Sequence, residues 1–316
     1  MNVATTTRET ALQLLCTLYE PEVAESVLQQ IWQRLPDARH EPGSKRNDCM
    51  IISYADTISA EGEVPLQTLR RFLNIHVGDT FGRVHLLPFF PSSSDDGFAV
   101  IDYRMVDHHV GGWSDIEDLA QDYDLMFDLV INHCSRESLW FADFINGRDP
   151  GRHYFITLPE ESDVSAVVRP RSSPLISAVH TYGGIRHVWN TFSEDQIDLD
   201  FSNPQVLLEF VDILMLYIER GAKLIRLDAI AFLWKRLGTS CMSLPETHAV
   251  VKLLRLLMDE VCPHARLITE TNVPHDENVS YFGDGDEAHV VYQFSLAPLL
   301  LYSFVFGDGT YLTNWA

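Results

Sequence analysis

Short runs of apolar residues, rich in β-branched and aromatic side chains, recur along the chain and predict β-strands. Consecutive positions in each run are apolar, rather than every second one, which is typical of strands buried on both faces of a sheet. The candidate strands span residues 50–54, 84–90, 125–131, 223–230, 266–269 and 290–294. We therefore expect a sheet that other elements cover on both faces.

Between most of these runs, apolar residues follow a helical spacing. The expected helices cover residues 64–73, 113–121, 205–219, 245–261 and 297–304, and one or two more cover residues 8–34. A strand followed by a helix, repeated along the chain, is typical of a parallel sheet. A (β/α) barrel and a doubly wound sheet both fit, but no glycine-rich phosphate-binding sequence follows the first strand, so we favour the barrel.

The alternation is interrupted once, at residues 134–201, where prolines, glycines and aromatic residues are frequent. We interpret this interval as domain B, a domain inserted after the third strand near the barrel opening. The expected organisation is an N-terminal helical segment at 1–45, catalytic barrel at 46–133, the inserted domain at 134–201 and further barrel at 202–316. A loop is expected at 40–47. The chain thus predicts an α/β fold, a (β/α)8 TIM barrel that is incomplete, with about six strands.

Composition limits the possible binding partners and the cellular compartment of the protein. Asp and Glu number 45 against 23 Lys and Arg, and the net charge of −22 disfavours binding to nucleic acid or to an anionic membrane. The first residues lack a signal-peptide pattern, and no apolar run reaches the ~18 residues of a membrane span. The five cysteines are odd in number and form no CxxC pair, so we expect buried free thiols in a reducing cytoplasm.

A carboxylate and a guanidinium are expected to face one interior near the end of the fourth candidate strand. In KLIRLDA, Arg226 and Asp228 are two positions apart and lie on one face of the strand, whereas Leu227 lies on the other. A structural ion pair is one interpretation, although burying two charges is costly. The functional interpretation is that Arg226 lowers the pKa of Asp228 and keeps it ionised as a nucleophile.

Two further strands also end in polar residues. Glu270 follows the apolar run LIT at the carboxyl end of the fifth strand, where barrel enzymes build their active sites. Asn132 and His133 end the third strand, and we interpret Asp128 as a structural residue at its start. Each side chain alone fits a structural role. Together they predict an active site, because one ionised and one protonated carboxyl group are what glycosyl transfer requires.

Three segments that carry these residues, DLVINH, GAKLIRLDA and ITETN, resemble the α-amylase clan of glycoside hydrolases. The resemblance implies a TIM barrel with a domain inserted after strand three, and a retaining double displacement. It also implies Asp228 as the nucleophile, Arg226 as its partner and Glu270 as the general acid/base.

The flanking sequence is similar to the sucrose-phosphorylase-like branch of that clan, in LLPFFPSSSDDGFAVIDY and SEDQIDLDF. The forms SSDDGF and RPRSSPLI look most like those of glucosylglycerate phosphorylases. This resemblance implies that Asp95 and Phe98 border the glucosyl subsite. It also implies that His133 and Gln196 hydrogen-bond the sugar, with Asn132 beside them in the substrate site.

The resemblance further implies that Arg171, together with Arg169, helps hold inorganic phosphate. A guanidinium matches the geometry of phosphate, and local positive charge in so acidic a chain suits an anionic acceptor. The alternative is a solvated loop that carries two charges.

The sequence is compatible with three functions. The first is a glucoside phosphorylase that acts on a small glucoside and phosphate, and the second is an α-glucosidase-type hydrolase or a transglucosylase. The third is a truncated, non-catalytic fragment, because the clan's fourth segment, with a transition-state-stabilising Asp, is expected after Ala316. On that expectation the chain alone is weakly active or inactive. We expect no metal and no cofactor beyond phosphate as co-substrate, and a homodimer is compatible with the sequence.

Overall fold

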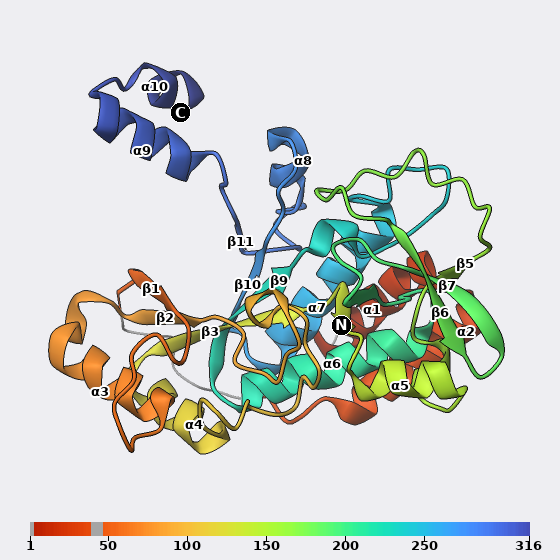
Figure 1. Ribbon diagram of the computed structural model, residues 1–316, viewed down its shortest axis with the longest axis horizontal. Helices are drawn as coiled ribbons and strands as arrows, with labels where there is room; N and C mark the ends of the chain where they lie inside the picture. The colour runs from red at the N-terminus through yellow and green to blue at the C-terminus, as the bar shows by residue number, and fades with distance from the viewer. Residues whose placement is uncertain (1–2, 39–46) are drawn as a thin grey trace.

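The computed structural model describes residues 3–38 and 47–316 and is built around one parallel sheet (Figure 1). Six strands pair in the order β1 (Met50–Ser53), β2 (Arg83–Leu86), β3 (Asp124–Val130), β9 (Ala222–Asp228), β10 (Arg266–Thr269) and β11 (Val290–Val291). Neighbouring strands are parallel throughout. The sheet forms half of a barrel, so the predicted incomplete (β/α) barrel and all six candidate strands are confirmed.

The middle strands of the sheet are the most deeply buried. All seven residues of β3 are buried, and in β9 only Lys223 is partly exposed. Burial on both faces explains why the sequence of these strands is apolar without alternation. It also makes the buried charged residues in the second half of these strands, Asp128, Arg226 and Asp228, exceptional.

Helices cover the outside of the half-barrel, where apolar residues at helical spacing find their partners. The strands β1 to β3 are connected through α3 (Pro65–His76) and α4 (Trp113–Asp122), which contact each other. Ten residues of α6 (Pro204–Glu219) are buried, and α2 (Pro21–Arg34) packs on that helix. The helix α1 (Val3–Leu18) packs on α7 (Pro245–Val261). The 8–34 interval therefore forms two helices.

The interval that breaks the alternation contains small antiparallel sheets. After β3, β4 (His133–Ser135) pairs with β8 (Gln196–Asp198). Between them lie α5 (Leu139–Asn146) and a sheet in the order β5 (Thr157–Leu158), β7 (Gly184–Trp189), β6 (Ile176–Thr181). Figure 1 shows β5, β6 and β7 grouped at one end of the molecule, away from α3 and α4. A second apolar cluster, formed by Leu175, Trp189 and Cys241, lies in this region.

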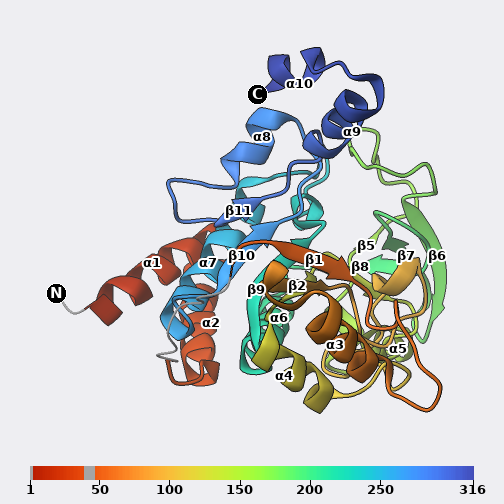
Figure 2. The ribbon, with the colours of Figure 1, turned by 90° about the vertical axis from the view of Figure 1, so that its left-hand side faces the viewer.

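The last helices stand apart from the rest of the molecule. After α8 (His275–Ser280) and β11, α9 (Leu296–Phe306) and α10 (Thr310–Trp315) project from the body in both ribbon views (Figures 1 and 2). No residue of α9 is buried although the helix is strongly apolar, and Phe304 is 85% exposed. These side chains form an uncovered apolar surface.

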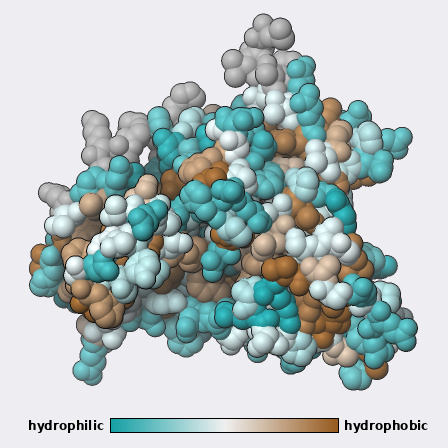
Figure 3. All heavy atoms as spheres, turned by 90° about the horizontal axis from the view of Figure 1, so that it is seen from above, coloured by the Kyte–Doolittle hydropathy of each residue, from teal (hydrophilic) through white to brown (hydrophobic). Residues whose placement is uncertain are grey.

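On the face seen in Figure 3, hydrophobic patches are separated by hydrophilic residues. In the part of the chain that the structure describes, no helix combines the length and the apolar character that crossing a bilayer requires. The five cysteines are free, but the prediction that all are buried is wrong: Cys16 and Cys49 are exposed. Of the loop predicted at 40–47, only Asn47 lies within the described residues.

Candidate active site

Arg226 is the centre of a cluster of carboxyl groups that lie within or just after the second half of three adjacent strands. Its Nη1 lies 2.5 Å from Asp128 Oδ1 and 3.0 Å from Asp228 Oδ1. Its Nη2 lies 3.4 Å from Glu270 Oε1. The strand register explains the grouping, because β3 places Asp128 opposite Arg226 on β9 and β10 ends one residue before Glu270. The structure thus brings together the predicted residues Arg226, Asp228 and Glu270.

The backbone turn after the predicted nucleophile orients Glu270. Ala229 has a φ of 50°, in the left-handed region that a non-glycine residue rarely adopts. In this conformation its N–H donates a 2.8 Å hydrogen bond to Glu270 Oε2. Glu270 is therefore held by one backbone amide and one guanidinium, which aligns it beside Asp228.

Two aromatic rings hold the guanidinium in place. The Arg226 Cζ atom lies 5.6 Å from the centre of the Phe98 ring and 5.3 Å from that of Tyr292. Cation–π attraction of this kind is stronger when the cation is desolvated, and the Arg226 side chain is only 10% exposed. Phe98, predicted to border the sugar, is thus also a neighbour of Arg226.

The charge balance of the cluster differs from the sequence-based prediction. Burial raises the pKa of Asp228 to about 8, against the lowering effect of Arg226, and the neighbouring Glu270 and Asp128 raise it further. Arg226 lowers the pKa of Asp228, as predicted, but burial outweighs this effect, so the prediction that Arg226 keeps Asp228 ionised is wrong for the free site. Burial lowers the pKa of Arg226, but Asp128, Asp228 and Glu270 raise it more, so Arg226 stays charged. One cation faces three carboxyl groups, which favours retention of a proton.

Asp128 was misplaced by the sequence analysis. It lies inside β3, not at its start, and its side chain is fully buried between Arg226 and His85. His85 Nε2 lies 2.9 Å from Asp128 Oδ2. The sequence does contain an indication of this position. A charged residue among the apolar residues of a buried strand rarely lacks a partner.

A second group contains the residues assigned to the sugar by resemblance. Gln196 Nε2 donates to Asp95 Oδ2 at 2.8 Å and lies 3.1 Å from His133 Nε2. His133 Nε2 also lies 3.0 Å from the carbonyl oxygen of Phe98. Burial lowers the pKa of His133, which favours the neutral ring. The structure thus brings Asp95, Phe98, His133 and Gln196 into direct contact.

Asn132 joins this group through two residues that the sequence analysis did not identify. Lys235 Nζ lies 2.6 Å from Asp198 Oδ2 and donates to Asn132 Oδ1 at 2.7 Å. Asn132 Nδ2 donates to the same oxygen of Asp198 at 3.0 Å. The Lys235 side chain is 6% exposed and that of Asp198 is fully buried. No local sequence pattern marks Lys235, because it follows an irregular turn after β9.

The two predicted phosphate-binding arginines differ in their surroundings. Arg169 Nη1 lies 3.4 Å from the carbonyl oxygen of Asn190 and 3.5 Å from that of Thr191, so it contacts the two residues that follow β7. Burial lowers the pKa of Arg169. Arg171 is exposed, and among the described residues it forms no hydrogen bond or ion pair with another side chain. The structure therefore does not bring Arg171 into either group.

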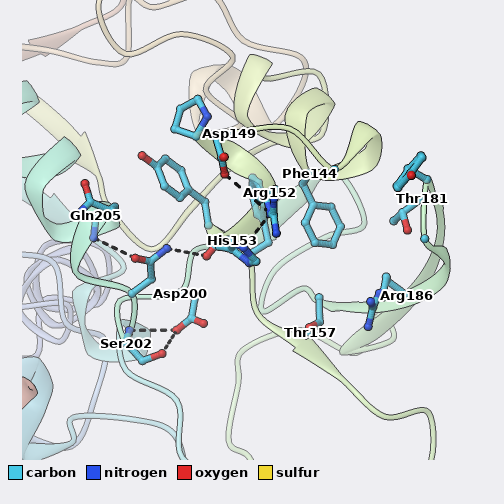
Figure 4. A pocket seen from close by; sticks show the side chains of 17 residues that line it. Phe144, Asp149, Arg152, His153, Thr157, Thr181, Arg186, Asp200, Ser202 and Gln205 are labelled. Atoms are coloured by element: carbon cyan, nitrogen blue, oxygen red, sulfur yellow. Dashed lines mark hydrogen bonds and ion pairs between the residues drawn. The ribbon is translucent and has the colours of Figure 1, made fainter.

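Two features lie outside these groups. A pocket of about 1020 Å³ opens between α5, β6, β7 and the start of α6, lined by Arg152, Arg186 and Asp200 among others (Figure 4). The ligand atoms of Asp107, His108 and His109 lie within 4.8 Å of one another, a grouping that the sequence analysis did not identify as a possible metal site. Both histidines are exposed, and His109 Nδ1 already pairs with Asp107 at 2.9 Å.

Comparison with known proteins places this geometry in a family. Residues 80–305 match the family described as alpha amylase, catalytic domain. The chain belongs to that α-amylase family. The matched region contains the Arg226 cluster, the His133 group and the interval between β3 and β8.

The most similar relatives include two glucosylglycerate phosphorylases. The protein from Spirochaeta thermophila is 48% identical and the alignment covers 96% of this chain and 54% of that protein. The protein from Allomeiothermus silvanus is 49% identical, with 98% and 56% covered. The chain thus spans about half the length of the curated relatives it matches.

A solved structure of the same family shares the fold. The crystal structure of sucrose 6F-phosphate phosphorylase from Thermoanaerobacter thermosaccharolyticum aligns with a TM-score of 0.75 at 30% identity. The alignment covers 86% of this chain and 57% of that one. The α-amylase-type barrel, incomplete in this chain, is therefore supported by sequence and by structure.

Proposed function

We propose that this chain is the first part of a retaining α-glucoside phosphorylase. The enzyme transfers a glucosyl unit from glucosylglycerate, or a related small glucoside, to inorganic phosphate and releases α-glucose 1-phosphate. The observation that carries the proposal is the pair of carboxyl groups, Asp228 and Glu270, bridged by the single guanidinium of Arg226. The names of relatives that are nearly half identical in sequence support glucosylglycerate as the donor.

The first half-reaction requires an ionised nucleophile and a protonated acid. Burial raises the pKa of Asp228, which favours a proton on this carboxyl group in the free site. Transfer of that proton to Glu270 leaves Asp228 as a carboxylate beside Arg226 and makes Glu270 the acid. Asp228 then attacks the anomeric carbon while Glu270 protonates the departing oxygen, which gives a glucosyl ester and free glycerate.

The second half-reaction reverses the first with phosphate in place of the departed group. A phosphate oxygen attacks the anomeric carbon, Asp228 leaves as a carboxylate, and Glu270 accepts the proton from phosphate. Two inversions at one carbon retain the α configuration. We assign Arg171 and Arg169 to phosphate, because a guanidinium fork matches its oxygens and the rest of the chain is strongly acidic.

The sugar itself is assigned to the second group. Asp95 and Gln196 offer a carboxylate and an amide for the glucosyl hydroxyls, and His133 and Asn132 form the wall beside them. Phe98 contacts this wall through its carbonyl group and Arg226 through its ring, so it links sugar binding to the nucleophile. Domain B, residues 134–201, contributes Gln196 to this group.

The proposal includes no metal and no cofactor other than phosphate as co-substrate. It places the enzyme in the cytoplasm, where phosphate is abundant and the five free cysteines remain reduced. Nucleic acid and membranes are not partners in this proposal, because the net charge of −22 repels both. A homodimer is compatible with it.

The test is an assay for glucose 1-phosphate with glucosylglycerate or sucrose as donor, with and without phosphate. It uses the 316-residue chain and a form extended to the length of the relatives. We expect phosphate-dependent release from the extended form, weak or no release from the chain alone, and none from the Asp228→Asn variant. Free glucose that appears regardless of phosphate would show a hydrolase instead.

A further inference from the structure

Lys235 lies at the centre of a buried polar network that joins three segments of the fold. Its ammonium group donates to Asp198 of β8, to Asn132 after β3 and, at 2.5 Å, to the carbonyl oxygen of Phe232. An ammonium group has three N–H donors, and all three are used. A buried lysine with every donor satisfied is held in one position.

The partner of Lys235 is equally constrained. Asp198 accepts from the backbone N–H of Thr191 at 2.8 Å and from its hydroxyl at 2.6 Å, in addition to Lys235 and Asn132. Removing Lys235 alone would leave a fully buried carboxylate without its cation, which is strongly unfavourable.

This ion pair fixes the orientation of the Asn132 amide. The ammonium group only donates and the carboxylate only accepts, so the amide oxygen must face Lys235 and the amide nitrogen must face Asp198. The same amide nitrogen lies 3.3 Å from His133 Nδ1. His133 Nδ1 therefore meets a donor and is the unprotonated nitrogen of the ring.

The other ring nitrogen meets an acceptor. His133 Nε2 lies 3.0 Å from the carbonyl oxygen of Phe98, to which it donates. Gln196 Nε2 also lies 3.1 Å from this ring nitrogen, but its two hydrogens have acceptors in Asp95 Oδ2 at 2.8 Å and in the same carbonyl oxygen at 3.4 Å. The ring is thus a neutral imidazole with its proton on Nε2, on the side of the sugar group.

We propose that Lys235 is a positioning residue of the sugar site, whose charge orients Asn132 and thereby keeps His133 a neutral donor at Nε2. Without the cation, the Asn132 oxygen loses its donor and only Asp198 still holds the amide nitrogen, so less opposes a turn of the oxygen toward His133 Nδ1. Both ring nitrogens then face acceptors beside an unpaired Asp198, which favours the imidazolium cation. The role in sugar binding rests on the proposed function, but the effect on the His133 ring does not.

The charged groups that face His133 support a rise of its pKa when Lys235 is removed. Burial has the largest effect and lowers the pKa of His133, and Lys235 lowers it further. Asp198 and Asp95 raise it. Removal of Lys235 leaves Asp198 and Asp95 to act on the ring without a compensating cation.

The test is NMR of the histidine rings in isotope-labelled chain, with the His133 signal assigned by its loss in His133→Gln. We expect a neutral Nε2–H ring in the unmodified chain at neutral pH. In Lys235→Met the ring should become cationic, with a pKa above the ordinary value of about 6.5. Lys235→Arg should restore the neutral ring, because it keeps the charge.

The matched control is Lys252→Met, which removes a lysine of α7 that pairs with Asp286 and Glu287, and it should leave the His133 signal unchanged. If Lys235→Met does not fold, Lys235→Gln provides the same test, because it keeps hydrogen-bond donors but no charge. A ring that stays neutral with its proton on Nε2 in the folded charge-free variant would overturn the proposal. The readout needs no turnover, so it is independent of the outcome of the phosphorylase assay.

Discussion

At the scale of single residues, the cluster around Arg226 combines one permanent cation with three carboxyl groups. All of these side chains except Glu270 are at most 10% exposed, so water screens their charges little. Such a cluster is sensitive to the loss of any member. Its stability and its protonation can therefore be tested separately from catalysis.

Replacement of Arg226 by Met is expected to destabilise the chain. The variant leaves the fully buried Asp128 carboxylate without this cation and removes the donor to Asp228, and breaking a buried ion pair typically costs about 3–5 kcal/mol in the free energy of unfolding. Urea denaturation at neutral pH measures the change. The control is Arg186→Met, which removes an exposed arginine and should change stability by less than about 0.5 kcal/mol. Equal stability of the two variants would contradict this account of the cluster.

Replacement of Asp228 by Asn is expected to have the opposite effect. The carboxyl group has a pKa of about 8 in the folded chain and near 3.8 when it is unfolded. Between those pH values the folded state binds more protons, so the free energy of unfolding falls as pH rises. We expect Asp228→Asn to be more stable near neutral pH, by on the order of 2–4 kcal/mol, and to gain little near about pH 4. Denaturation curves of both proteins at several pH values measure this gain in stability. A gain that does not shrink in acid would contradict the prediction.

The sequence could reveal some of these residues but not others. Arg226 and Asp228 could be predicted to share a face, because strand periodicity fixes the direction of alternate side chains. Asp128 was predicted at the start of its strand but lies within it, where it pairs with Arg226 and His85. Lys235 and Asp198 are far apart in sequence, and only the folded chain brings them together. The sign of the Asp228 pKa shift depends on burial, which the sequence does not give.

At the scale of elements, the junction between α6 and β9 positions the strand that carries Asp228. Gly221 lies there with a φ of 103°, and a Cβ atom at this position would lie 2.8 Å from the Cβ of Ala120 in α4. Both the conformation and the close approach require glycine. The strands and helices themselves were predictable from apolar patterns, but this contact between α4 and the junction was not.

Replacement of Gly221 by Ala is expected to destabilise the chain by about 2–4 kcal/mol, from backbone strain and the clash with α4. The matched control is Gly238→Ala, where φ is 80° and no atom lies within 4 Å of the added Cβ. Its cost should be near 1 kcal/mol, roughly that of strain alone. Thermal unfolding measures the melting temperature of both variants. Equal decreases in melting temperature would show that the contact with Ala120 is unimportant.

At the scale of the whole molecule, the half-barrel leaves a large apolar surface uncovered on α9 and α10. The exposed side chains include Leu301, Phe304, Val305 and Phe306. Monomeric proteins rarely expose contiguous apolar patches of this kind. The sequence predicted the apolar helix at 297–304 but not its exposure, since periodicity cannot show whether a partner element is present.

We expect the chain to self-associate through this surface. The double replacement Leu301→Glu and Phe304→Glu should reduce association, because it places two charges on the helix face. Sedimentation velocity over a range of concentrations measures the effect. Tyr182→Glu, which alters another exposed aromatic residue at the end of β6, is the control and should leave association unchanged. Monomers at every concentration in the unmodified chain would contradict this prediction.

The central claim is that Asp228 is the nucleophile and Glu270 its acid/base, and peptide mass spectrometry of a trapped intermediate tests it most directly. The extended form with Glu270→Gln is mixed with α-glucosyl fluoride, whose leaving group needs no acid, and quenched in acid. The account predicts a glucosyl group on the peptide that contains Asp228, and release of this group as glucose 1-phosphate at a slow rate when phosphate is added. A glucosyl group on another residue, or turnover of the fluoride by Asp228→Asn at an unchanged rate, would contradict the account.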